Sequence, residues 1–160
     1  MSNIYRDYVA MCPEFRQGIA HLAAGEHEEA LDAFARADIR TSRDDVYKNK
    51  YQSFHGFLLL QSGHSKGIEL CRSAAAQECF DGDVFYNLAR AELEMGHRRE
   101  AIRAIRRGLD IDAKHPDMIR LRQRLGVRRS LMFAFLGRDN PINRIIGKFT
   151  YGSSSLRCFV

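Results

Sequence analysis

Long apolar runs, prolines and paired cysteines are all scarce in this chain of 160 residues. No stretch approaches the roughly 20 uninterrupted apolar residues needed to cross a bilayer, and residues 1–10 carry no basic-then-apolar export signal. Three prolines and twelve glycines are too few for a low-complexity or collagen-like chain, while 45% hydrophobic residues are enough to bury a core. We therefore expect one folded, cytoplasmic protein.

Motifs of enzyme chemistry are also missing. There is no nucleophile elbow, no phosphate-binding glycine loop and no HExxH pair. The four cysteines lack CxxC spacing, which excludes a zinc ribbon and a dense disulfide framework, and Cys71 is expected in the core. His64 and His97 each follow a glycine at the same point of a repeat, and His55 is expected to be hydrogen-bonded in the interior. We predict no catalytic residue, no metal site, no cofactor and no enzymatic activity.

Charge is divided unevenly along the chain. Residues 1–97 hold ten Lys and Arg against fifteen Asp and Glu, a net charge of −5, whereas residues 98–160 hold fifteen against five, a net charge of +10. A basic segment favours association with acidic partners, whether protein, lipid headgroup or nucleic acid. Nucleic acid is the least expected of them, because no aromatic residues for base stacking are interleaved with the arginines of 98–107.

An internal repeat organises the first two thirds of the chain. Gly25, Gly63 and Gly96 each end an apolar segment and are each followed by a polar turn and a second amphipathic segment. Their spacings are 38 and 33 residues. Seven residues before each glycine stands a small residue: Gly18, Gly56 and Ala89.

Matching residues recur after each turn as well. Three positions match across the three repeats. The first position is small (Ala30, Gly67 and Ala101), the second is larger (Phe34, Cys71 and Ile105), and the third is small again (Ala37, Ala74 and Gly108). Two antiparallel helices approach closely only where both present small side chains, so the first set should meet the small residues before the turn. The larger residues would fill the space between successive helix pairs.

This pattern resembles the tetratricopeptide repeat, a helix-turn-helix unit of 34 residues. The resemblance covers residues 11–116, and the third repeat matches best, through Phe85, Leu88, Ala89, Gly96, Ala101, Ile105, Gly108 and Pro116. It implies an all-α fold, a superhelix of three helical hairpins whose first helices line a concave groove. A repeat of this kind buries its apolar face only by stacking on its neighbours.

Local signals place the helices near 13–24, 27–39, 43–62, 65–79, 83–95 and 98–111. Ser42 and Asp45 have the spacing of a capping box before the third of these. Pro116 should open a seventh helix that caps the stack, with Arg120, Arg122 and Arg124 on its other face. We therefore expect a repeat domain with its capping helix over residues 1–126.

We expect the remaining residues to form a basic amphipathic tail at 127–151 and a flexible C-terminus at 152–160. Residues 131–136 are an unbroken apolar run, and Pro141 can start a short helix. One face of that helix would carry Ile142, Ile145, Ile146 and Phe149. The tail can fold back on the repeats as ordinary core, contact a partner or a second copy of the chain, or dock on a membrane surface.

By the same resemblance, the groove would be lined by residues of the first helix of each hairpin. They are Phe15 and Ile19, Ser53 and Phe57, and Tyr86, Asn87 and Arg90. Each of these residues could equally be packing. The function that this implies is a non-catalytic adaptor or co-chaperone-like module that holds a protein or peptide segment in the groove. The alternatives are a peripheral membrane organiser that uses the tail, and a secretion-type chaperone.

Overall fold

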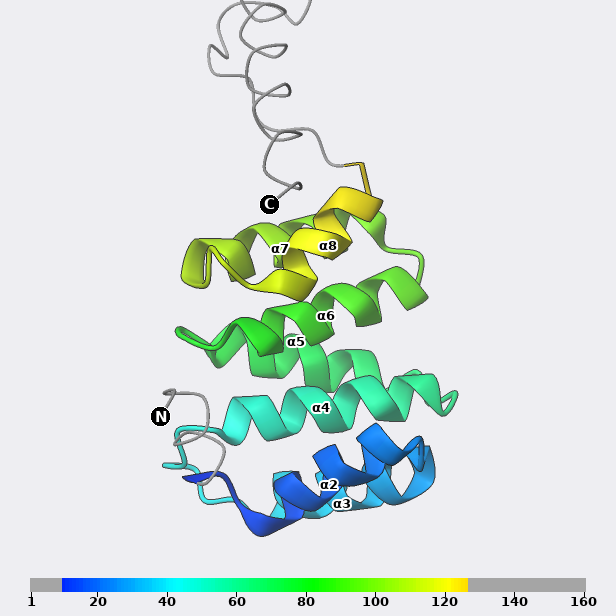
Figure 1. The fold of residues 1–160 in the computed structure, drawn as a ribbon, viewed down its shortest axis with the longest axis vertical. Helices are drawn as coiled ribbons and strands as arrows, with labels where there is room; N and C mark the ends of the chain where they lie inside the picture. Colours follow the sequence, from blue (N-terminus) through cyan, green and yellow to red (C-terminus); the bar gives the residue numbers. More distant parts are fainter. Residues whose placement is uncertain (1–9, 127–160) are drawn as a thin grey trace, which may run out of the picture. The chain divides into compact units, whose positions relative to one another are not determined.

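A computed structural model describes residues 10–126 of the chain. Within these residues the protein is all-helical, with no strand, which confirms the predicted all-α class (Figure 1). The helices are α2 (Pro13–Ala24), α3 (His27–Arg40), α4 (Lys48–Gln61), α5 (Gly67–Gln77), α6 (Gly82–Glu94), α7 (Arg98–Ile111) and α8 (Pro116–Arg124).

Consecutive helices pack in pairs, α2 with α3, α4 with α5, and α6 with α7, and α8 packs on α7. In Figure 1 the pairs lie one above another in chain order, from α2 and α3 at the bottom to α8. The turn inside each pair contains a glycine in the left-handed region: Gly25 at φ 81°, Gly63 at φ 91° and Gly96 at φ 77°. These are the glycines that mark the repeat, so the turns fall where the sequence predicts them.

Two helix backbones come close together inside the second pair, where Gly56 of α4 meets Gly67 of α5. A methyl group added to Gly56 would lie 2.8 Å from the carbonyl oxygen of Gly67 and 3.0 Å from the backbone nitrogen of Cys71. The third small residue of the last repeat, Gly108, lets α8 approach α7. A methyl group there would lie 2.9 Å from Cε of Met118. Small residues therefore set the spacing both within and between layers.

The core of the first two pairs is largely aromatic. Phe15 of α2 is buried, and its ring centroid lies 5.2 Å from that of Phe34, 4.9 Å from that of Tyr51 and 5.1 Å from that of Phe54. The tilted and edge-on arrangements are those that aromatic rings prefer. Cys71 lies in the same cluster, and burial raises the pKa of its thiol to about 12, as suits a cysteine that acts as a small apolar residue.

Hydrogen bonds and ion pairs between polar side chains connect neighbouring helix pairs. His55 of α4 is hydrogen-bonded to Asp38 of α3, with 2.8 Å between Nδ1 and Oδ2, as expected for an interior histidine. Lys50 of α4 lies 3.1 Å from Asp81 and 2.7 Å from Asp83 at the start of α6. Burial alone would lower the pKa of Lys50, but the two carboxylates outweigh it and raise that pKa.

The start of α4 differs from the prediction, because the helix begins at Lys48 and not at residue 43. Ser42 and Asp45 do not form a capping box. Instead the backbone N–H of Asp45 bonds to the carbonyl of Ser42, and Asp45 Oδ1 accepts the backbone N–H of Tyr47 at 2.8 Å. Short polar side chains compete in this way with the helix for nearby backbone groups, and residues 41–47 are not helical, with turns at 43–44 and 46–47.

The end of α5 is also earlier than predicted, at Gln77 and not at residue 79. Glu78 supplies the reason, since its Oε1 accepts the backbone N–H groups of Cys79, Phe80 and Asp81 at 2.9, 2.9 and 3.0 Å. A single buried carboxylate oxygen thus accepts three successive backbone N–H groups. In a longer helix these N–H groups would bond to carbonyl oxygens of the preceding turn instead.

The predicted tail lies outside the described residues. This holds for 127–151, for 152–160 and for the apolar positions Ile142, Ile145, Ile146 and Phe149. In the part of the chain that is described, no helix combines the length and the apolar character that a bilayer crossing requires.

Arg72 of α5 and Glu92 of α6 form a second ion pair that joins the second and third helix pairs. Nε and Nη2 of Arg72 lie 2.8 and 3.0 Å from the two oxygens of Glu92, and His97 Nδ1 lies 2.9 Å from Glu92 Oε2. Burial alone would raise the pKa of Glu92, but Arg72 and His97 outweigh it and hold that pKa below its usual 4.5. The ionised carboxylate therefore stabilises the fold above about pH 4.5, and this contribution is lost as the pH falls through the lowered pKa.

Replacing Arg72 with methionine should therefore destabilise the protein in a pH-dependent manner. At neutral pH we expect a loss of about 2 kcal/mol, less than the about 3–5 kcal/mol of a fully buried pair, because water reaches the Arg72 side chain. Urea unfolding followed by circular dichroism measures the difference from wild type. That difference should shrink as the pH falls from 4.5 through the lowered pKa of Glu92, below which this carboxyl group is protonated in both proteins. A difference independent of pH would contradict the role of the pair.

Candidate functional site

The seven predicted groove residues separate into an interior set and a surface set. Phe15, Ser53 and Asn87 are 1%, 0% and 2% exposed, and Ile19 is half-buried against the core of the first two pairs. The three buried side chains pack in the interior, the alternative that the sequence left open, whereas Ile19 keeps part of its side chain exposed. Tyr86 and Arg90 are half-buried at the surface, and Phe57, which is 2% exposed, lies in the core directly beneath Arg90.

Ser53 and Asn87 form a buried polar bridge between α4 and α6. Asn87 Nδ2 donates to Ser53 Oγ at 3.2 Å, and Ser53 Oγ donates in turn to the carbonyl oxygen of Lys50 at 2.8 Å. Buried polar groups are stable where they find partners of this kind. The bridge fixes the register of α6 on α4 and so positions the side chains further along the two helices.

Arg90 of α6 stacks on two aromatic rings. Its guanidinium carbon lies 3.8 Å from the ring centroid of Phe57 on α4 and 5.4 Å from that of Tyr86, one helical turn earlier on α6. A planar guanidinium placed over a ring is attracted to the negative face of the ring. Because stacking uses the flat face, the N–H donors at the edge of the guanidinium remain available for other bonds.

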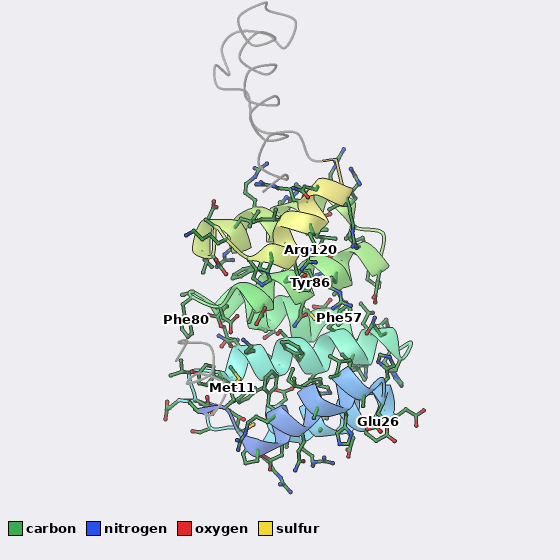
Figure 2. The ribbon with its side chains drawn as sticks, viewed as in Figure 1. Met11, Glu26, Phe57, Phe80, Tyr86 and Arg120 are labelled. Atoms are coloured by element: carbon green, nitrogen blue, oxygen red, sulfur yellow. The ribbon has the colours of Figure 1, made fainter. Side chains whose placement is uncertain are left out.

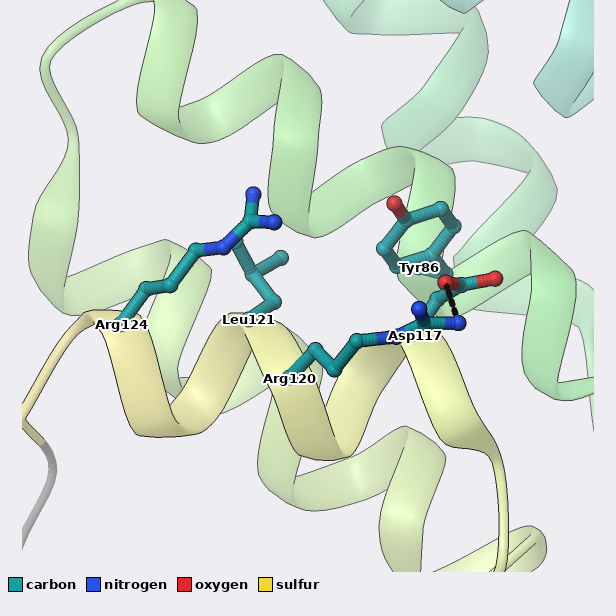
Figure 3. Close-up of a pocket in the computed structure, with 5 residues that line it drawn as sticks. All are labelled: Tyr86, Asp117, Arg120, Leu121 and Arg124. Carbon is teal, nitrogen blue, oxygen red and sulfur yellow. Dashed lines mark ion pairs between the residues drawn. The ribbon is translucent and has the colours of Figure 1, made fainter.

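A small hollow adjoins this stack between α6 and α8 (Figure 3). Tyr86 of α6 lines one side of it, and α8 supplies Asp117, Arg120, Leu121 and Arg124. The cavity has a volume of about 80 Å³. Arg120 and Asp117 form an exposed ion pair of 2.9 Å at its rim, drawn as a dashed line in the figure. Tyr86 is therefore common to the arginine stack and to the hollow.

We call these residues the arginine–aromatic surface: Phe57, Tyr86, Arg90, Arg120 and Arg124. Figure 2 places Phe57, Tyr86 and Arg120 one after another along the stack of helices. The surface thus spans α4, α6 and α8, and three of its five side chains are arginines.

The position of α8 depends on His115, which precedes its first turn. His115 Nε2 lies 3.0 Å from Asp83 Oδ1, and His115 Nδ1 accepts the backbone N–H of Met118 at 3.4 Å. The ring of His115 also packs against Tyr86, with 5.6 Å between the centroids. Burial alone would raise the pKa of Asp83, but Lys50 and His115 outweigh it and hold that pKa below its usual range.

Sequence reasoning did not assign Arg120 and Arg124 to the site, although it placed both on the basic face of the capping helix. Arg120 and Arg124 are four residues apart, with Leu121 between them, and this spacing was a usable signal because such positions lie on one helix face. His115 was missed as well. Its place directly before Pro116, where a helix cap is expected, is the signal that would have found it.

Comparison with known proteins does not indicate a function, so the function is inferred from the geometry of the site. No family model matches the chain, and no curated protein resembles it closely enough in sequence to count as a relative. Among residues 10–126, no three His, Cys, Asp or Glu side chains gather in a way that could hold a metal ion.

Proposed function

We propose that the protein is a non-catalytic interaction module of the tetratricopeptide-repeat kind that binds a segment of another protein. The observation that carries this proposal is the arginine–aromatic surface, which lies on the first helices of successive pairs and on α8. Stacked aromatic and arginine side chains are typical of residues that dominate binding energy at protein interfaces. Adaptors and co-chaperones use repeats of this kind, and such a role would suit a cytoplasmic protein.

The helix pairs support the repeat assignment. Three successive pairs turn on a glycine with positive φ, and the glycine contact between α4 and α5 lies at the position where the repeat pattern puts a helix crossing. Stacked pairs present an extended surface built from equivalent helices, which suits an extended or helical peptide.

The proposal is tested by affinity capture from the cells that make the protein, with identification of bound proteins by mass spectrometry. Wild-type protein should retain a specific partner, and Tyr86→Ala with Arg90→Met should reduce its capture by about tenfold or more. Phe57 is left unchanged, because its ring is 2% exposed and its removal would also damage the fold.

The matched control is Arg103→Met. Arg103 lies on α7, is exposed, and is not part of the arginine–aromatic surface. Its replacement should leave capture of the partner unchanged, and both variants should keep the helical circular dichroism of the wild type. Equal capture by all three proteins would show that the partner binds elsewhere.

A further inference from the structure

Several cations of the described chain bridge helices of different layers, and one of these bridges contains no anionic group. Lys50 is held by Asp81 and Asp83, and Arg72 is held by Glu92. Arg90 bridges α6 to α4 only through ring stacking, and within residues 10–126 it has no carboxylate partner and no hydrogen bond. A partly desolvated guanidinium with free donors gains most from an anionic acceptor that comes from outside the chain.

The neighbouring helix adds positive charge around the same point. Arg124 of α8 likewise has no carboxylate partner among the described residues, and Arg120 has only the exposed pair with Asp117, three residues away. An exposed pair of this kind contributes little and exchanges readily. Tyr86 contacts the stack and lines the hollow, so an anionic segment that reaches Arg90 can continue to Arg120 and Arg124.

We infer that the arginine–aromatic surface recognises an acidic protein segment, in which one Asp or Glu side chain binds Arg90 and a second binds the arginines of α8. The carboxylate accepts two parallel N–H bonds from the edge of the Arg90 guanidinium, while Phe57 and Tyr86 hold the guanidinium plane in place. This inference rests on the proposed function and adds to it the chemistry of the partner.

A peptide fits the surface better than a nucleic acid does. A nucleic acid carries a negative charge at every phosphate along its backbone. Asp117 stands at the rim of the hollow and Asp83 lies one turn before Tyr86, so a continuous polyanion would meet carboxylates as well as arginines. A peptide can place its acidic residues at Arg90, Arg120 and Arg124 and neutral residues between them.

The experiment is selection of a displayed library of random peptides on the full chain. Wild-type protein should enrich peptides that contain Asp or Glu, and Arg90→Met should remove this enrichment. A synthetic copy of an enriched peptide is then measured by fluorescence anisotropy. Changing its acidic residues to Asn or Gln should weaken binding about tenfold, since a charge-assisted hydrogen bond is involved. Arg103→Met should bind the acidic copy as the wild type does.

Other outcomes separate this inference from the proposed function. Enrichment of neutral or basic peptides whose binding is lost in Tyr86→Ala would overturn the acidic specificity and leave the interaction module standing. No enrichment, or equal binding of the acidic copy to wild type and Arg90→Met, would overturn the inference. It would also be overturned by a single-stranded oligonucleotide that displaces the acidic copy and binds more tightly than it through Arg90.

Discussion

Gly56→Ala should destabilise the protein by about 3 kcal/mol, at the upper end of overpacking effects. The added methyl group would lie 2.7 Å from Cβ of Leu70, 2.8 Å from the carbonyl oxygen of Gly67 and 3.0 Å from the backbone nitrogen of Cys71. Two of these three neighbours are backbone atoms, which move only if α5 moves as a whole away from α4. In an open helix the same change would stabilise by about 1 kcal/mol, because alanine is the better helix former. Urea unfolding followed by circular dichroism measures the result.

Gly25→Ala is the matched control for this prediction. Nothing lies within 4 Å of a methyl group at Gly25, so the change there tests only backbone strain at φ 81°. That strain costs about 1–2 kcal/mol. If Gly25→Ala proved as harmful as Gly56→Ala, or if Gly56→Ala were neutral, close contact between α4 and α5 would not be what requires the glycine.

Most of the helical framework could be predicted from the sequence because its determinants are local and recur. Gly25, Gly63 and Gly96 end helices by adopting a backbone conformation that other residues disfavour, and this requirement is visible wherever it occurs. Small residues at fixed distances from these turns then indicate which helix faces can approach, as Gly56 and Gly67 do. Neither signal depends on knowing the rest of the fold.

The first residue of α4 and the last residue of α5 could not be predicted in the same way. Ser42 and Asp45 suit a capping box by spacing alone, yet the structure uses both in turns. Glu78 is a good helix former whose carboxylate bonds to backbone groups beyond the helix instead. In each case several local hydrogen-bond patterns compete, and tertiary packing of the following helix selects among them.

The sequence did not distinguish the buried from the surface residues among the candidates for the site. Tyr86 and Arg90 lie at the surface, whereas Ser53, which matches Tyr86 in the repeat, and Asn87 are buried. The difference arises because α4 and α6 pack against each other through the Ser53–Asn87 bridge. Contacts between helices of different pairs are not encoded in the period of either helix.

Phe15→Ala should cost about 3–5 kcal/mol, the range for removing a large side chain from a packed core. The Phe15 ring touches Phe34, Tyr51 and Phe54, which come from α3 and α4, so its loss leaves a cavity between the first two helix pairs. If Phe15 were a groove residue, the same change would weaken partner binding and leave stability almost unaltered. Urea unfolding separates these readings, and a midpoint close to that of wild type would contradict the interior assignment.

Arg90→Met is the counterpart of this variant on the arginine–aromatic surface. Its expected loss of stability is about 0.5–1 kcal/mol, the contribution of a cation stacked on rings near the surface, because the methionine side chain still covers Phe57. The repeat pattern assigned Phe15 and Arg90 to the same groove, whereas in the structure Phe15 is buried and Arg90 lies at the surface. The two variants together test this difference. Phe15→Ala should change stability several-fold more than Arg90→Met, and Arg90→Met should lose the acidic peptide while its fold persists.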